Sequence, residues 1–301
     1  MTHHIVLIAA AAGLSAAPAA AKDSAWLQKQ IAQAKPGAVI IIPAGDYDLT
    51  DAKIARSMTL KGDGAVTLRS AAVTEKGILV PLQGVDLTLE NLTFAGARSW
   101  DRNGAGVRHE GRNLTIVNCR FIANEDGILA TGDETGAILI RDSSFIDNGF
   151  GDGQSHAIYV SSGRRIEVEG STFEGTRIGH HLKSLAGETI VRDVVFDDAR
   201  GRGSYAIDAS KGGALSVENS TFIQAADGEN QAMVNYDLSR GGAAAGVRFI
   251  NPKIVNAYEG AVFLRNDTKT APVIIGAAIE NRARQPLRMV SPGSPKPKTN
   301  P

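Results

Sequence analysis

The feature that most constrains this fold is a phenylalanine that returns at a nearly regular interval through the middle of the 301-residue chain. The series runs Phe94, Phe121, Phe145, Phe173, Phe196 and Phe222, and Phe249 continues it. The successive intervals are 27, 24, 28, 23, 26 and 27 residues. Each phenylalanine closes a similar segment, of which LTIVNCRF and IEVEGSTF are typical. A period of roughly 20–50 residues predicts a solenoid, because one repeat alone cannot bury its apolar face.

Each repeat has the alternating pattern of short strands. In LTIVNCRF, the side chains of Leu114, Ile116 and Phe121 have the spacing of residues that point into a core. Three residues before each phenylalanine stands a residue that tolerates left-handed backbone, and we expect the asparagines among them to hydrogen-bond along the stack. These residues are Asn91, Asn118, Asp142, Gly170, Asp193 and Asn219. A second strand follows in each repeat, as in HAIYVS and GHHLKS. The sequence therefore predicts an all-β fold, a single-stranded parallel β-helix with coils about 4.8 Å apart.

The segment before the first coil has a different pattern. Residues 24–36 place Trp26, Leu27 and Ile31 near helical spacing, and the strand GAVIIIPAGDYDL follows. A solenoid needs a cover over its open end, so we expect a capping helix near residues 24–34. This helix, this strand and the coils after them resemble the pectate-lyase-like right-handed parallel β-helix superfamily, over about residues 24–285. The resemblance implies a right-handed coil, as crossover preference does, but no single activity, because the superfamily includes lyases, epimerases, hydrolases and non-catalytic proteins.

Composition limits the remaining possibilities. The formal net charge is zero, which gives no electrostatic reason to expect a nucleic-acid partner. Residues 1–21 have the apolar core and small-residue end of a secretory signal and are too short to span a membrane, so we expect a periplasmic or secreted protein. We expect residues 22–290 to form one monomeric β-helix domain and the Pro-rich tail 291–301 to be disordered. Cys119 is the only cysteine, and we expect it to pack in the core.

Candidate chemistry is concentrated in three adjacent coils. Three of the four histidines outside the signal segment are His156, His180 and His181. If Ile158, Leu182 and Ile207 point inward, then Tyr159, Lys183 and Asp208 form one outward column, and His181 lies in a neighbouring outward column. The opposite register would bury an unpaired ammonium and expose a leucine, so we favour the first. His156 and His180 stand where the chain leaves a turn, and the pattern leaves their direction open.

These residues suggest roles in proton transfer on an acidic polysaccharide. Lys183 or His181 would neutralise the substrate carboxylate or take its proton, with His156 as a further catalytic candidate. Tyr159 would act as acid, or as base if the neighbouring cation favours its ionised form, while Asp208 orients Lys183. The predicted binding residues for the anionic polymer are Arg108, Arg177, His180 and Arg202. The motifs HAIYV, GHHLKS and SYAIDASKGG are similar to those of exported bacterial β-helix proteins, which supports these residues as a unit.

Two reactions and a non-catalytic role remain open at this point. A lyase acting by β-elimination is our first hypothesis, and C5 epimerisation begins with the same proton removal. Hydrolysis needs two carboxyl groups at a defined separation, and Asp208 is the only acid of the predicted column. A non-catalytic binding or scaffold protein is the alternative, and it should have an even face rather than a cleft walled by loops 97–105, 149–155 and 226–232. No cofactor motif is found, although the loop Asp147–Gly153 offers oxygens for Ca²⁺ without matching a complete calcium motif.

Overall fold

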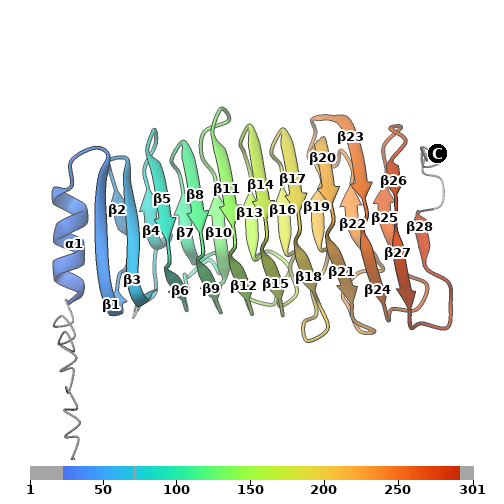
Figure 1. Ribbon diagram of the computed structural model, residues 1–301, viewed down its shortest axis with the longest axis horizontal. Coiled ribbons are helices and arrows are strands. Elements are labelled where there is room, and N and C mark those ends of the chain that lie inside the picture. The colour runs from blue at the N-terminus through green and yellow to red at the C-terminus, as the bar shows by residue number, and fades with distance from the viewer. Residues whose placement is uncertain (1–22, 71, 292–301) are drawn as a thin grey trace, which may run out of the picture.

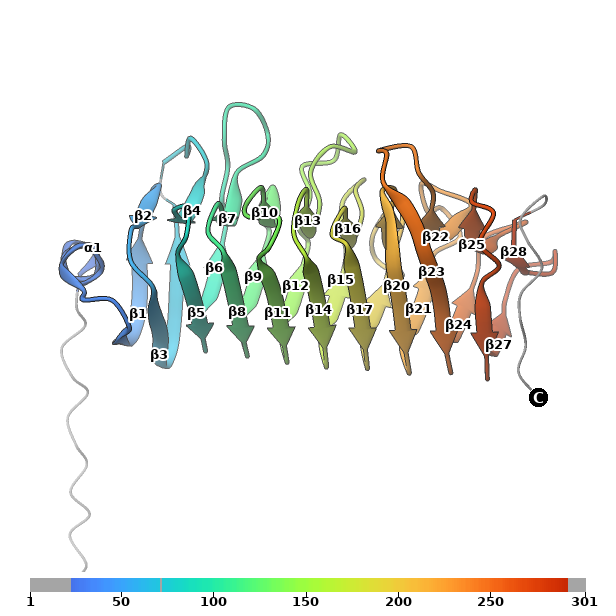
Figure 2. The same ribbon diagram turned by 90° about the horizontal axis from the view of Figure 1, so that it is seen from above.

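The strands stack along one axis into an elongated solenoid (Figures 1 and 2). The computed structural model describes residues 23–70 and 72–291. The predicted signal segment and almost all of the predicted tail lie outside the described residues. Every strand pairing is parallel, and eight successive triplets of strands, from β4–β6 to β25–β27, each form one coil. The predicted parallel β-helix is therefore confirmed.

The first strands of the coils form a ten-stranded sheet, which carries the candidate functional residues. This sheet contains β2 (Ala52–Ile54), β4 (Gly77–Pro81), β7 (Ala105–His109), β10 (Asp126–Ala130), β13 (Ile158–Val160), β16 (Leu182–Ser184), β19 (Ile207–Ala209), β22 (Ala232–Tyr236), β25 (Val262–Asn266) and β28 (Arg288–Val290).

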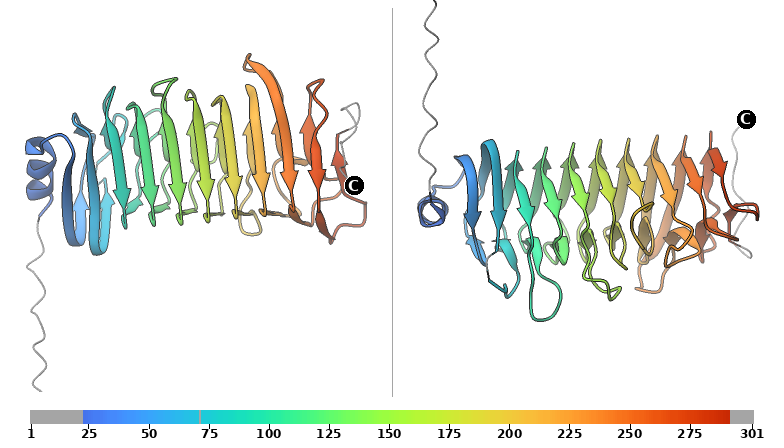
Figure 3. Two further views of the ribbon diagram at one scale, coloured as in Figure 1. Left: turned by 45° about the horizontal axis from the view of Figure 1, so that its top comes forward. Right: turned by 90° about the horizontal axis from the view of Figure 1, so that it is seen from below.

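The other strands form an eighteen-stranded sheet that closes the coil on its remaining sides (Figure 3). Its N-terminal strands are β1 (Ala38–Asp48) and β3 (Met58–Arg69). The second strands of the coils are β5 (Asp86–Glu90), β8 (Asn113–Val117), β11 (Ala137–Arg141), β14 (Arg165–Glu169), β17 (Glu188–Arg192), β20 (Gly212–Glu218), β23 (Ala243–Ile250) and β26 (Val273–Ile275). The third strands are β6 (Thr93–Ala95), β9 (Arg120–Ile122), β12 (Ser144–Ile146), β15 (Thr172–Glu174), β18 (Val195–Asp197), β21 (Thr221–Gln224), β24 (Lys253–Asn256) and β27 (Ala278–Asn281).

The repeated phenylalanines form one continuous stack inside the solenoid. Neighbouring rings from Phe94 to Phe222 lie 4.7 to 5.2 Å apart between centroids and are nearly parallel. Phe249 does not continue this stack, so that part of the prediction is wrong. Phe249 lies on β23, the second strand of its coil, where it pairs with Val217 of β20. On β24, the third strand of that coil, Ile254 takes the position next to Phe222. The core otherwise follows the sequence period, because equivalent residues of successive coils pair with one another, as Phe121 does with Phe145.

The predicted turn residues mark one corner of six successive coils. All six have positive φ angles, between 48° and 58°, which Asn, Asp and Gly adopt at low cost. The Asn118 side chain donates a hydrogen bond of 2.9 Å to the Asn91 side chain on the preceding coil, as expected. Cys119 follows this corner and is buried, and burial raises the pKa of its thiol to about 12. It is thus a packed residue with little thiolate character.

The predicted capping helix is also confirmed. Helix α1 (Ser24–Gln33) lies across the N-terminal end of the solenoid (Figure 1). The side chain of Asp23 accepts a hydrogen bond from the Trp26 amide and caps the helix start. Leu27 and Ile31 are buried in the common core, which covers the first coil. Among residues 23–70 and 72–291, no helix is long and apolar enough to cross a membrane.

Candidate functional site

The predicted register of the three central coils is confirmed. Ile158 pairs with Leu182, and Leu182 pairs with Ile207, and all three are fully buried. Tyr159 therefore lies next to Lys183, and Lys183 next to Asp208, on the outer face of the ten-stranded sheet. We call these three residues the Lys183 column. Burial of the alternate side chains fixes it, because a slip of one residue would exchange the two faces.

Lys183 lies between an aromatic ring and a carboxylate. Its Nζ is 5.0 Å from the centroid of the Tyr159 ring and 4.0 Å from Oδ2 of Asp208. Its side chain points outward, yet only 12% of it is exposed, so it is more covered than expected. Burial lowers the pKa of Lys183, and burial likewise raises the pKa of Asp208. Both shifts favour the neutral forms, so this pair is not a strongly stabilising ion pair.

His156 and His180 lie on the same side of the sheet as the Lys183 column. Their rings are stacked with centroids 4.7 Å apart, and His180 also stacks on Tyr205 at 5.1 Å. His156 meets the Tyr159 ring edge-on at 5.5 Å, and Nε2 of His180 is 3.6 Å from Oδ2 of Asp208. The direction that the sequence left open is thus toward the column.

Backbone amides determine the form of these two imidazoles. The amide of His180 donates to Nδ1 of His156 at 3.0 Å, and the amide of Tyr205 donates to Nδ1 of His180 at 3.2 Å. Asp126 occupies the equivalent position one coil earlier, and its Oδ1 accepts from the His156 amide at 2.7 Å. Since Nδ1 is an acceptor in both rings, a neutral imidazole carries its proton on Nε2. Burial lowers the pKa of His156 well below its usual range and that of His180 to about 3, so both rings stay neutral.

His181 does not join this group, and its predicted outward direction is wrong. Strand β16 begins at Leu182, so His181 lies before the strand and the alternation of faces does not apply to it. Its ring lies 6.0 Å from both Phe173 and Phe196 in the core. Nδ1 is hydrogen-bonded to the Thr176 hydroxyl at 2.7 Å. His181 therefore lies on the interior side of the coil, away from Lys183.

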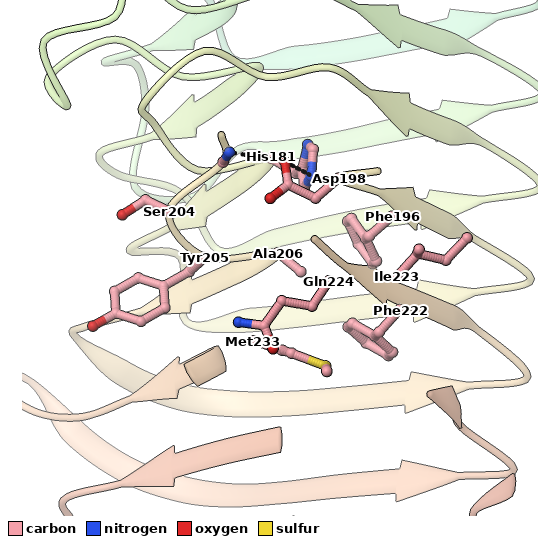
Figure 4. A pocket seen from close by; sticks show the side chains of 11 residues that line it. His181, Phe196, Asp198, Ser204, Tyr205, Ala206, Phe222, Ile223, Gln224 and Met233 are labelled. Carbon is pink, nitrogen blue, oxygen red and sulfur yellow. Dashed lines mark hydrogen bonds and ion pairs between the residues drawn. The ribbon is translucent and has the colours of Figure 1, made fainter. Parts of the chain in front are cut away.

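His181 borders a small internal cavity with Asp198, Phe222 and Met233 (Figure 4). The cavity has a volume of about 20 Å³, enough for about one water molecule. Nε2 of His181 has no hydrogen-bond partner among the described residues and is 3.9 Å from Oδ1 of Asp198. Burial lowers the pKa of His181 to about 3 and raises that of Asp198 to about 7. The cavity is too small for a sugar and is best explained as a hydrated corner of the core.

The predicted arginines divide into two groups. Arg108 belongs to the face of the Lys183 column, because it pairs with Leu129, which pairs with Tyr159. Its Nε is buried without a hydrogen-bond partner among the described residues. The backbones of Arg177 and Arg202 form an isolated parallel β-bridge on the corner loops that precede β16 and β19. The structure thus places Arg108 on the candidate face and the other two at its margin.

Asp237 is a neighbour of the Lys183 column that was not predicted from the sequence. It follows β22, two residues after Asn235, which is the neighbour of Asp208 in the outward register. The side-chain nitrogen Nδ2 of Asn235 donates hydrogen bonds to Oδ1 of Asp208 at 2.8 Å and to Oδ2 of Asp237 at 3.0 Å. Asp237 also accepts from the amide and hydroxyl of Ser239, which holds it in a turn. Its position after a strand gave no signal, because DLS after an apolar run is typical of an ordinary turn.

A groove runs along the side of the ten-stranded sheet at which its strands end. It has a volume of about 450 Å³ and is lined by residues that follow β13, β16, β19 and β22, including Arg164, Leu185 and Lys211. The loops predicted to wall the site, 97–105, 149–155 and 226–232, precede strands of this sheet. They therefore lie on the opposite side, at which the strands begin. Arg102 joins the first two loops through the Phe150 ring at 4.7 Å and Asp152 at 3.5 Å. This groove is therefore not the predicted cleft between those loops.

The described residues include no group of three or more His, Cys, Asp or Glu side chains placed to hold a metal ion. In the loop Asp147–Gly153, Asp152 pairs with Arg102 and its Oδ1 accepts a hydrogen bond from the Gln154 amide. Its carboxylate therefore already has partners within the protein.

The family model described as the right-handed β-helix region matches residues 76–239, which is more than half of the chain. This chain belongs to the right-handed β-helix family. The match covers the Lys183 column and confirms the handedness that the sequence resemblance implied. No curated protein sequence matches the chain.

Solved structures with the same β-helix fold are distant in sequence. ORF18 of Geobacillus virus E2 has a TM-score of 0.54 at 14% identity, over 88% of this chain and 58% of the viral one. A mutant of a PL6 family alginate lyase has a TM-score of 0.51 at 13% identity, over 88% of this chain and 38% of the lyase. An alginate lyase from Paenibacillus sp. str. FPU-7 has a TM-score of 0.49 at 14% identity, over 89% and 97%. At these identities the likeness shows the β-helix fold and no more.

Proposed function

We propose that this β-helix protein is an exported enzyme that cleaves an acidic, uronate-containing polysaccharide by β-elimination. The observation that carries the proposal is the Lys183 column, with a phenol, a partly desolvated amine and a carboxylate on three successive coils. This set provides a base, an acid and an orienting group at one place. One structural neighbour is an alginate lyase, so the β-helix fold is compatible with such a reaction.

The reaction requires a proton to leave C5 of the uronate and the C4–O bond to break. In our proposal Lys183, in its neutral form, takes the C5 proton, and the electron pair forms the C4–C5 double bond. The Tyr159 hydroxyl gives its proton to the departing glycosidic oxygen. Asp208 orients Lys183, and the Nε2–H of His180 compensates the charge of the substrate carboxylate. Arg108 lies three strands before Lys183 and would bind a different uronate unit of the polymer. Burial lowers the pKa of Lys183, which increases the fraction of the base form at neutral pH.

Hydrolysis has weaker support, although Asp208 now has a carboxylate neighbour. A retaining or inverting glycosidase needs room for a sugar or a water between its two carboxyl groups. Here the side-chain nitrogen Nδ2 of Asn235 lies between Asp208 and Asp237 and donates a hydrogen bond to each carboxylate. Asp126 is three strands from Asp208, or about 14 Å at the usual strand spacing, which exceeds the separation that hydrolysis uses.

Two further possibilities share parts of this geometry. A C5 epimerase would remove the same proton and return one to the opposite face of the sugar. A non-catalytic binding or scaffold protein would hold the polymer on the same face without turnover. The partly desolvated amine beside the Tyr159 ring favours the enzyme, because a purely binding face gains nothing from covering an ammonium.

The test is a screen of the purified protein on alginate, polygalacturonate and other acidic polysaccharides, followed by ultraviolet absorbance of the unsaturated product. New reducing ends without this absorbance would indicate hydrolysis, and altered sugar configuration without cleavage would indicate epimerisation. On a polymer that the wild type cleaves, Lys183→Ala and Tyr159→Phe should each lower kcat by about two orders of magnitude or more, the size of a lost acid or base.

Matched controls are available on the other sheet. Lys253 is exposed on β24, and Tyr258 follows that strand, so Lys253→Ala and Tyr258→Phe make the same chemical changes away from the column. Both controls should keep wild-type turnover. Full activity in the Lys183→Ala, Tyr159→Phe double variant would refute the assignment of the column. Asp208→Asn should reduce kcat less than either change, because its role is orientation.

A further inference from the structure

The line of outward residues that contains Lys183 continues toward the C-terminal coils. Asp208 pairs with Asn235, and Asn235 pairs with Arg265, so Arg265 lies three strands beyond Lys183 in the same line. At the usual spacing of parallel strands this is about 14 Å along the solenoid axis. The side chain of Arg265 is 47% exposed, which leaves part of the guanidinium available to a ligand.

A cleft of about 350 Å³ opens at this position. Its lining includes Arg265, Arg288, Asp267, Tyr205, Asn230 and Gln231. Tyr205 connects this cleft to the Lys183 column, since its ring stacks on His180 and the residue lines the same cleft as Arg265. The cleft and the column are therefore parts of one continuous surface.

The charges in the cleft favour an anion. Arg265 pairs with Asp267 at 2.6 Å. Arg288 donates to the carbonyl of Gly260 at 3.3 Å and has no carboxylate within ion-pair distance in the part of the chain that the structure describes. One positive charge thus remains uncompensated beside an aromatic ring and two amides. A planar guanidinium suits a carboxylate because it donates two parallel hydrogen bonds.

We propose that Arg288, Arg265 and Tyr205 form a second binding subsite, which holds the carboxylate of a uronate unit downstream of the one at Lys183. This inference rests on the proposed function and adds to it the course of the polymer, which runs along the solenoid axis toward the C-terminal coils. A substrate must then be long enough to span about 14 Å before it gains from the subsite. The alternative course leads sideways into the groove with Arg164 and Lys211.

The experiment uses uronate oligomers from dimer to octamer and the intact polymer, prepared from alginate and from polygalacturonate. Arg288→Gln should lower kcat/KM roughly tenfold or more on long substrates, mainly through KM, since a hydrogen-bonded charge is lost from ground-state and transition-state binding alike. The same variant should match the wild type on the shortest oligomer that is cleaved. Arg265→Gln should show the same dependence on length.

Arg164→Gln is the matched control, because it removes the same charge from the sideways groove. An equal effect of Arg288→Gln on every length, or no effect, would overturn the subsite, and a length dependence seen only in Arg164→Gln would assign the other course. Calorimetric titration of octamers into Lys183→Ala separates this inference from the proposed function. If Arg288→Gln weakens octamer binding but the wild type shows no turnover, the subsite is supported and the lyase proposal is refuted. Neither binding nor turnover refutes both.

Discussion

Two adjacent residues on strand β16 should respond in opposite ways to truncation. Leu182 is fully buried between Ile158 and Ile207 on the neighbouring coils, whereas Lys183 points to the outer face. Leu182→Ala removes three carbon atoms, worth about 2–3 kcal/mol of transfer free energy. The stacked strands on both sides cannot collapse into the space, so a cavity term adds to this loss. We expect a total decrease of about 3–5 kcal/mol in the free energy of unfolding.

Lys183→Ala should change the free energy of unfolding by about 1 kcal/mol or less. Burial shifts the pKa of Lys183 down and that of Asp208 up, so the desolvation cost of this pair offsets much of its attraction. Asp208 keeps its hydrogen bonds from Asn235 and Ser210 after the change.

Urea unfolding followed by circular dichroism measures both variants. Since a solenoid can lose cooperativity between its coils, the slope with denaturant has to agree with the wild type before midpoints are compared. If Lys183→Ala is as destabilising as Leu182→Ala, the assignment of inner and outer faces on β16 is incorrect.

Two further predictions concern buried ionisable groups. Burial raises the pKa of Asp198 to about 7, so between about pH 4 and 7 the folded protein keeps a proton that the unfolded chain releases, and stability falls as the pH rises. Asp198→Asn retains an acceptor for the Gly203 amide and should raise the urea midpoint at pH 8 but not near pH 4; an equal shift at both pH values would contradict this cause. Long-range nitrogen-15 spectra should show His156 and His180 as Nε2–H tautomers that do not titrate between pH 5 and 8, and a ring that gains a proton in this range would contradict the amide contacts.

The fold and the register of the Lys183 column were predictable because they depend on residues that repeat. Asn118 and its equivalents mark the corner, Phe121 and its equivalents fill the core, and burial of Leu182 rather than Lys183 is decided by a difference of several kcal/mol. Phe249 keeps the interval but not the position. The connection between β22 and β23 is four residues longer than the one between β19 and β20, and β23 adds one more residue at a register shift, so Phe249 lies in the preceding column. An interval in sequence therefore gives a position in space only while the coils keep the same lengths.

The candidate site was predictable only where it lies within strands. Alternation of faces is a property of extended, hydrogen-bonded backbone, and it applies to Tyr159, Lys183 and Asp208 because each belongs to a strand. His181 stands one residue before β16, where the chain still turns, and its ring points to the core. Asp237 stands one residue after β22, where an acidic residue is also typical of a turn. At strand ends the direction depends on contacts with neighbouring coils, which a single sequence does not show.

The row formed by Asp126, His156, His180 and Tyr205 explains how this face can hold so many polar side chains. Asp126, His156 and His180 each accept the amide of the next residue in the row, so the backbone satisfies one polar atom of each buried group. Such a row must consist of acceptors, and a protonated imidazole would lose this contact. The histidines are thus kept neutral beside Lys183, which limits the positive charge near its amine. A pH below about 3, which protonates His180, should disturb the geometry of Lys183 before it unfolds the coils.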